Sequence, residues 1–151
     1  MSEMSEERRF YVPPGGPPAP DPRNSEIYAI MGEENIFKML ADFYQELGAS
    51  SISYMFPEDL VLASERSAAF FVSVLGGPPL YQQKYGPPMM RKRHMPFVID
   101  ENARQVWLAC FKKTLIGADE KYKFPMDHMD SFWYFLDSFS GWMVNAKSDK
   151  S

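Results

Sequence analysis

A chain of 151 residues is long enough for one domain with its own hydrophobic core, and its formal net charge of −4 excludes a general attraction to nucleic acid or to an acidic membrane. Apolar residues make up 45% of the chain and aromatic residues 15%, which excludes a disordered protein. The single cysteine, Cys110, excludes an internal disulfide framework, and the N-terminus lacks the apolar run of a signal peptide. The apolar run over residues 68–75 is too short to span a membrane, so we expect a cytoplasmic protein with neither nucleic acid nor a membrane as partner.

The first 24 residues differ from the rest because they carry six of the thirteen prolines. Proline at this density blocks helix formation and favours an extended chain. We therefore expect an N-terminal extension over residues 1–24 that packs loosely or stays mobile, followed by one domain over residues 25–148 and a short tail at 149–151. The alternative is a docking segment for a proline-recognising groove or a neighbouring subunit, anchored by Phe10 and Tyr11.

After the extension, apolar residues recur with the period of helices. Ser25 predicts the N-cap of a short helix that ends at Gly32, and the stripe over residues 33–47 predicts the first long helix. Further helices are expected over residues 59–77, 100–117 and 126–147, with Asp100 as an N-cap. No segment shows the alternation of a strand, so the expected fold class is all-α, with four main helices and several short ones.

The segment from residue 75 to residue 97, LGGPPLYQQKYGPPMMRKRHMPF, is stiff, kinked and basic. Pro88 suits the first position of a short helix over residues 89–95, which would present His94. A lone histidine is more often a surface or packed residue than a ligand, and one imidazole makes no zinc site. A haem iron, however, needs only one protein ligand, and histidine commonly supplies it. The other histidine, His128, stands beside Asp127 and is expected to be exposed.

Five short motifs, in this order, resemble those of the truncated haemoglobins, most of all group II. They are FYQEL at residues 43–47, FPEDL at 56–60, LGGPPLY at 75–81, RKRHMPF at 91–97 and VWLAC at 106–110. The resemblance extends over about residues 27–148. It implies a truncated globin fold, the two-over-two helical sandwich, with haem b (iron protoporphyrin) as cofactor and His94 as the proximal ligand of the iron.

The resemblance also implies roles for individual side chains around the haem. Tyr44 and Trp107 match distal hydrogen-bond donors to the ligand, and Phe56 matches an aromatic residue that packs on the haem. With one deletion after Phe56, Ala63 takes the gate position and Ser67 the position one turn further on. Tyr81 matches a tyrosine that contacts a haem propionate, and Phe97 is expected to contact the cofactor. Arg91 and Arg93 lie within one turn of His94, so we expect them either to pair with haem propionates or to form a solvated basic face. From helical periodicity alone, Tyr44 and Trp107 are equally well explained as core residues of a bundle.

The function that the resemblance implies is binding of dioxygen and of other diatomic ligands such as NO and CO. One alternative is a redox enzyme, either a nitric oxide dioxygenase or a peroxidase-like catalyst. It would need an external reductase, because the chain has no nucleotide-binding motif such as GxGxxG. Another alternative is a haem-based sensor that docks through the proline-rich extension. The sequence leaves open whether the protein forms a homodimer.

Overall fold

Helices are the regular elements of residues 12–14 and 16–146, the part of the chain that the computed structural model describes. This confirms the all-α fold class. The four long helices are α3 (Glu33–Gly48), α4 (Leu60–Val74), α7 (Glu101–Thr114) and α9 (Met129–Met143). The short α-helices are α2 (Ile27–Met31), α5 (Leu80–Tyr85), α6 (Met90–His94) and α8 (Ala118–Tyr122). Three single 3-10 turns complete the order: η1 (Asn24–Glu26), η2 (Ser53–Met55) and η3 (Met126–His128).

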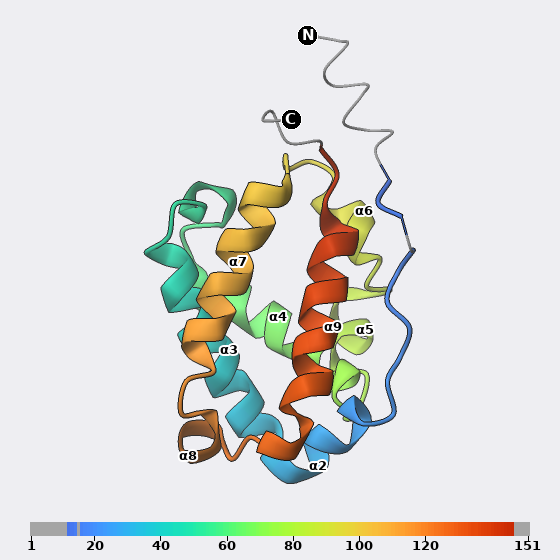
Figure 1. Ribbon diagram of the computed structural model, residues 1–151, viewed down its shortest axis with the longest axis vertical. Helices are drawn as coiled ribbons and strands as arrows, with labels where there is room; N and C mark the ends of the chain where they lie inside the picture. Colours follow the sequence, from blue (N-terminus) through green and yellow to red (C-terminus); the bar gives the residue numbers. More distant parts are fainter. Residues whose placement is uncertain (1–11, 15, 147–151) are drawn as a thin grey trace, which may run out of the picture.

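The long helices form two packed pairs, the two-over-two helical sandwich expected from the sequence. Helix α3 packs against α4, α7 packs against α9, and α3 also contacts α7. Figure 1 shows α7 and α9 side by side at the front, with α4 crossing behind them and the short α5 and α6 behind α9. No helix within the described residues is both long and apolar enough to cross a membrane.

Each of the four long helices contributes one phenylalanine to a shared cluster. Phe111 of α7 is its centre, and its ring centroid lies 4.1 Å from that of Phe43, 5.8 Å from that of Phe71 and 5.8 Å from that of Phe132. All four side chains are at most 2% exposed. Ring pairs at such distances stabilise a core by about 0.5–1.5 kcal/mol beyond the burial of their area. The cluster therefore fixes both helix pairs at one point.

Two long helices begin where the sequence predicts, and an aspartate caps each of them. Asp100 Oδ1 accepts a hydrogen bond from the Ala103 N–H at 2.9 Å, which confirms the predicted N-cap of α7. Asp59 caps α4 in the same way. The predicted cap at Ser25 is wrong, because Ser25 lies inside η1 and its hydroxyl donates to the Pro22 carbonyl at 2.8 Å.

The start of α6 also differs from the sequence prediction. Pro88 is not the first helical residue, and α6 begins at Met90. The residue between them, Met89, has φ of +40° and ψ of +53°, a left-handed conformation that turns the chain before the helix starts. The helix that carries His94 is therefore only five residues long.

The glycine pair after α4 allows two distant segments to approach each other. Gly76 has φ of +99°, and a Cβ placed there would lie 1.9 Å from the carbonyl oxygen of Ser25. A Cβ on Gly77 would lie 2.6 Å from the ring of Tyr28. The Tyr28 N–H donates to the Leu75 carbonyl at 2.8 Å, so the start of α2 is bonded to the end of α4. Only glycine leaves room for this crossing.

The described part of the N-terminal extension, residues 12–14 and 16–24, runs along α9 (Figure 1). Its prolines and the outer face of α9, including Tyr134, Phe135 and Trp142, line an open groove of about 700 Å³. The proposed anchors Phe10 and Tyr11 lie outside the described residues. The division of the chain at residue 24 stays a prediction.

The crossing at Gly76 generates a test of stability. Gly76→Ala should lower the free energy of unfolding by about 3 kcal/mol or more, because it adds a clash with a backbone carbonyl to the cost of a left-handed residue. Gly117→Ala is the matched control, since Gly117 also has positive φ, of +69°, but open space around its Cβ position. It should cost only about 1–2 kcal/mol. Urea unfolding measures the free energy of unfolding of both variants. An equal loss in the two would contradict the close approach of Gly76 to the Ser25 carbonyl.

Candidate functional site

A cavity of about 600 Å³ lies between the helix pairs, bounded by α3, α4, α6, α7 and α9. This volume is within the range of roughly 300–1,000 Å³ that small-molecule and cofactor pockets occupy. The structure brings nine of the ten predicted site residues into the wall of this one cavity. They are Tyr44, Phe56, Ala63, Ser67, Tyr81, Arg93, His94, Phe97 and Trp107.

His94 is the last residue of α6 and has one ring nitrogen already engaged. Its Nδ1 lies 2.7 Å from the carbonyl oxygen of Met90, one turn earlier in the same helix. A carbonyl oxygen only accepts, so Nδ1 carries the proton and Nε2 keeps its lone pair. Burial lowers the pKa of His94, although the Met90 hydrogen bond raises it in part, and this favours the neutral ring.

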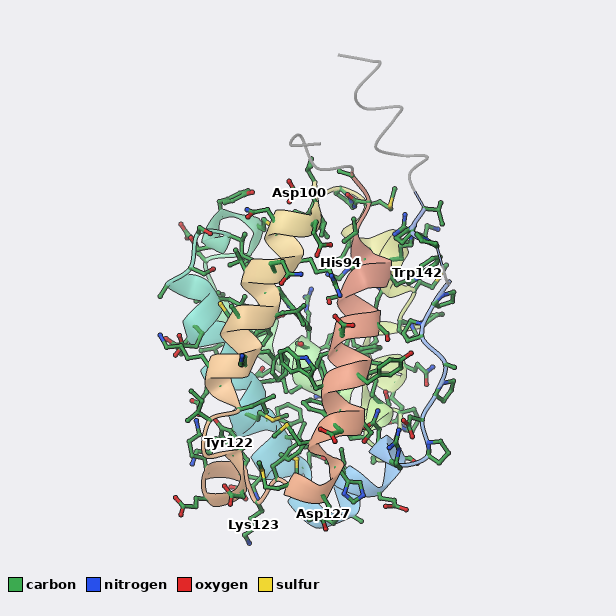
Figure 2. All side chains as sticks on the ribbon, viewed as in Figure 1. His94, Asp100, Tyr122, Lys123, Asp127 and Trp142 are labelled. Carbon is green, nitrogen blue, oxygen red and sulfur yellow. The ribbon has the colours of Figure 1, made fainter. Side chains whose placement is uncertain are left out.

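A neutral imidazole held in one tautomer by a carbonyl is the form in which histidine coordinates metals. Figure 2 shows His94 at the end of the molecule that also carries Asp100 and Trp142, opposite the end with Tyr122 and Asp127. The described residues contain no cluster of three or more His, Cys, Asp or Glu side chains that would hold a metal ion on its own. His94 is thus suited to a metal that brings its other ligands with it.

Tyr44 supplies a phenol to the cavity from α3. Its ring packs edge-on against Phe43 and Phe56, with centroid distances of 5.6 and 5.7 Å. Burial raises the pKa of Tyr44, and a side-chain hydrogen bond with Ser67 opposes that shift only in part. The phenol therefore stays protonated at neutral pH and can donate a hydrogen bond.

Trp107 supplies an indole N–H from α7. Its ring stands edge-on to Phe43, at a centroid distance of 5.3 Å and an interplanar angle of 88°. No residue in the described part of the chain accepts a hydrogen bond from this N–H, although Trp107 lines the cavity. Trp107 is only partly buried, and its unpaired N–H in the cavity wall can donate to an acceptor bound there.

Ala63 and Ser67 are one turn apart on α4, and both belong to the cavity wall. Ala63 is small and apolar, so it contributes space but no hydrogen bond. Ser67 contributes a hydroxyl next to the Tyr44 phenol. Both side chains thus lie in the cavity wall, and their register and roles stay predictions.

Arg91 is the predicted site residue that lies outside the cavity wall. It donates to the carbonyls of Trp142 and Val144, and its guanidinium lies over the Trp142 ring at 5.0 Å. The carbonyls at the end of α9 have no helical partner, and Arg91 satisfies two of them. Arg91 is therefore bonded to the end of α9, and its contact with the cofactor stays a prediction.

Arg93 remains in the cavity wall but is partly committed to its own loop. It donates to the carbonyls of Tyr85, Pro87 and Pro88 at 3.2, 2.9 and 2.7 Å. Its guanidinium also lies 5.5 Å from the centre of the Tyr81 ring. These contacts hold the loop before α6 and orient the charge.

Two arginines of the cavity wall were missed in the sequence, Arg66 and Arg104. Arg104 is only 15% exposed at its side chain and pairs with Glu101, with Asp137 and with the Ser140 hydroxyl, so it joins α7 to α9. Arg104 precedes Trp107 by three residues, which puts both on one helix face. This spacing is the signal in the sequence from which Arg104 could have been predicted as a residue of the site.

His128 was expected to be exposed, and this is wrong. Its side chain is 18% exposed, and its Nε2 lies 2.7 Å from Oε1 of Glu26. His128 belongs to η3, the turn directly before α9, and Glu26 belongs to η1. The contact therefore joins these two turns. Cys110 is buried, and burial raises the pKa of its thiol, which fits a packed residue.

Comparisons with known proteins agree on one family. A family model for bacterial-like globins matches residues 26–145. The chain is 35% identical over 89 residues to a group 2 truncated haemoglobin, YjbI, of Bacillus subtilis, and the aligned part covers 58% of this chain and 67% of that protein.

Solved structures are similar over most of the chain. The phosphate-bound Hell's gate globin IV is 38% identical, with a TM-score of 0.75, and the match covers 82% of this chain and 77% of that one. The truncated oxygen-avid haemoglobin of Bacillus subtilis is 29% identical, with a TM-score of 0.72, and the match covers 78% and 98% of the two chains.

The lowered pKa of His94 makes the stability of the fold depend on pH. The unfolded chain takes up a proton on this histidine near pH 6.5, before the folded chain does. The free energy of unfolding should therefore be full above about pH 6.5 and fall as the pH decreases toward the lowered pKa. His94→Gln should lack this part of the acid dependence. Urea unfolding at about pH 7.5 and pH 5.5 measures it, and equal pH dependence in both proteins would contradict a buried neutral His94.

Proposed function

This chain belongs to the bacterial-like globins, as a truncated haemoglobin most like group II, and on that basis we propose that it binds haem b in the cavity and holds dioxygen there. Family membership implies a haem cofactor and small diatomic ligands. The observation that carries the assignment to this site is the tautomer of His94. With Nδ1 donating to Met90, Nε2 is the atom left to bind iron.

The residues of the cavity fit an iron porphyrin. Phe56, Phe70 and Met90 provide an apolar wall for a flat macrocycle, and the cavity has the size of a cofactor pocket. When bound, haem supplies an iron that binds diatomic gases reversibly. His94 provides the single protein ligand that such an iron requires.

The arginines of the wall suit the two carboxylates that a porphyrin of this type carries. Arg66 is exposed and lies over the Tyr85 ring at 5.4 Å. Arg93 has donors beyond those it gives to its loop, because its Nη1 has no acceptor among the residues that the structure describes. We propose Arg66, Arg93 and the Tyr81 hydroxyl as partners of the propionates.

Tyr44 and Trp107 are proposed to hold the ligand by hydrogen bonds. Both are donors in the cavity wall at neutral pH, and aromatic rings pack against them. Each hydrogen bond to this partly charged acceptor is worth about 1–2 kcal/mol, which slows release about five- to thirtyfold. Ser67 supports this arrangement by orienting the Tyr44 phenol.

Removal of the iron ligand is the first test. His94→Ala should lose stable haem binding, because no second imidazole reaches the cavity, and added imidazole should restore a haem spectrum. His128→Ala is the control and should retain haem, since His128 does not line the cavity and directly follows Asp127, which lies at the opposite end of the molecule from His94 (Figure 2). Absorption spectra of the purified ferric, ferrous and carbon monoxide forms provide the measurement. Full haem content and unchanged spectra in His94→Ala would refute the proposed site.

Removal of the distal donors is the second test. Trp107→Phe and Tyr44→Phe keep most of the ring volume and delete one donor each, so each should speed oxygen release about five- to thirtyfold. Carbon monoxide gathers less negative charge, and its release should change much less. Because both donors share one acceptor, the double variant should be non-additive. Stopped flow measures the rates of oxygen and carbon monoxide dissociation. If both single variants release oxygen at the rate of the parent, Tyr44 and Trp107 serve only to pack the core.

A further inference from the structure

Asn145 is a fully buried amide in the segment that follows α9, with an exposed fraction of 0%. Its Nδ2 donates to the carbonyl of Phe97 at 2.9 Å and to that of His94 at 3.3 Å. Its Oδ1 accepts from the Ile99 N–H at 2.9 Å. One side chain therefore binds three backbone groups of residues 94–99, the segment that joins α6 to α7.

The backbone of Asn145 adds a fourth bond to the same segment. Its N–H donates to the Ile99 carbonyl at 2.9 Å. Residues 95–100 between the two helices form no regular element, and Pro96 has no N–H to donate. Polar backbone groups in such a segment need partners from elsewhere, and Asn145 supplies them. An apolar residue there would remove the acceptor of the Ile99 N–H and one donor each to the carbonyls of Phe97 and His94, and the His94 carbonyl would keep only the Phe97 N–H, at 3.0 Å.

Helix α6 depends on these contacts because a helix of five residues is not stable by itself. Arg91, near its start, donates to the carbonyls of Trp142 and Val144. Asn145 binds the carbonyl of His94 at its end. Both ends of α6 are thus fastened to the same short stretch, residues 142–145, at the end of α9.

We propose that Asn145 is a positioning residue for His94, and this inference rests on the proposed haem site. The direction of Nε2 depends on two anchors: the Met90 carbonyl holds the ring at Nδ1, and Asn145 holds the backbone carbonyl of the same residue. Loss of the second anchor lets the end of α6 rotate, so the imidazole no longer meets the iron at one fixed angle. Asn145 acts through His94 and touches neither cofactor nor ligand.

The experiment compares Asn145→Ala with Asn24→Ala in the haem-loaded protein. Asn24 is a matched control because it is also a buried asparagine, 3% exposed, bonded through its amide. Its partners are the carbonyl and hydroxyl of Ser131, at the start of α9 and away from α6. Both variants should melt at lower temperature than the parent. The deciding readout is the iron–histidine stretching band in the resonance Raman spectrum of the ferrous, ligand-free form.

In Asn145→Ala this band should shift and broaden, and haem transfer to excess apomyoglobin should be about 10–100-fold faster, as for other residues that orient a metal ligand. In Asn24→Ala the iron–histidine band and the rate of haem transfer should both match those of the parent, despite the lower melting temperature. If Asn145→Ala does not fold, Asn145→Asp takes its place, because it keeps the size and the acceptor for Ile99 and deletes the amide donors. An unchanged band and unchanged haem transfer in the Asn145 variant would overturn the inference.

Failure of the inference and failure of the proposed function give different results. If the parent shows an iron–histidine band that His94→Gly abolishes, the haem site stands, and only the Asn145 comparison decides its positioning role. If the parent shows no such band, His94 does not bind iron, and both the site and the role of Asn145 are refuted.

Discussion

The contact of four phenylalanines at Phe111 is the interaction on which the rest of this structure depends. A small helical domain that contains a large cavity cannot fill its interior evenly, so its packing has to be concentrated elsewhere. Phe43, Phe71 and Phe132 meet Phe111 from the three other long helices, and all are buried. This dense region holds the two helix pairs together and leaves the adjacent space free for a ligand.

The two ends of the cavity wall are stabilised by different means. Near the Phe111 cluster, Trp107 and Tyr44 are held by ring packing on long helices, so their positions follow from the core itself. On the other side, His94 stands on a helix of five residues that has few apolar contacts of its own and relies on polar contacts with the end of α9. We expect this side of the site to open more easily than the other, as weakly packed segments generally do.

Much of the fold could be predicted from the sequence because it depends on local signals. The stripe over residues 33–47 and the carboxylate of Asp100 define helices through periodicity and capping, which need no tertiary information. His94, Tyr44 and Trp107 were found through the resemblance of their motifs, since their spacing alone fits a core equally well. What could not be predicted depends on which elements meet. Arg91 turns to α9 because that helix ends beside α6, and Arg104 is drawn inward by Asp137 on a different helix.

The bond between Asn145 and His94 spans 51 positions of the chain. A ribosome adds roughly 5–20 residues per second, so the amide that steadies the histidine is made about 3–10 s after the histidine itself. During that interval α3, α4 and the Phe111 region can begin to assemble, while α6 still lacks both of its attachments to α9. Maturation of the site therefore follows the order in which the helices leave the ribosome, and α6 gains its attachments only after α9 has been made.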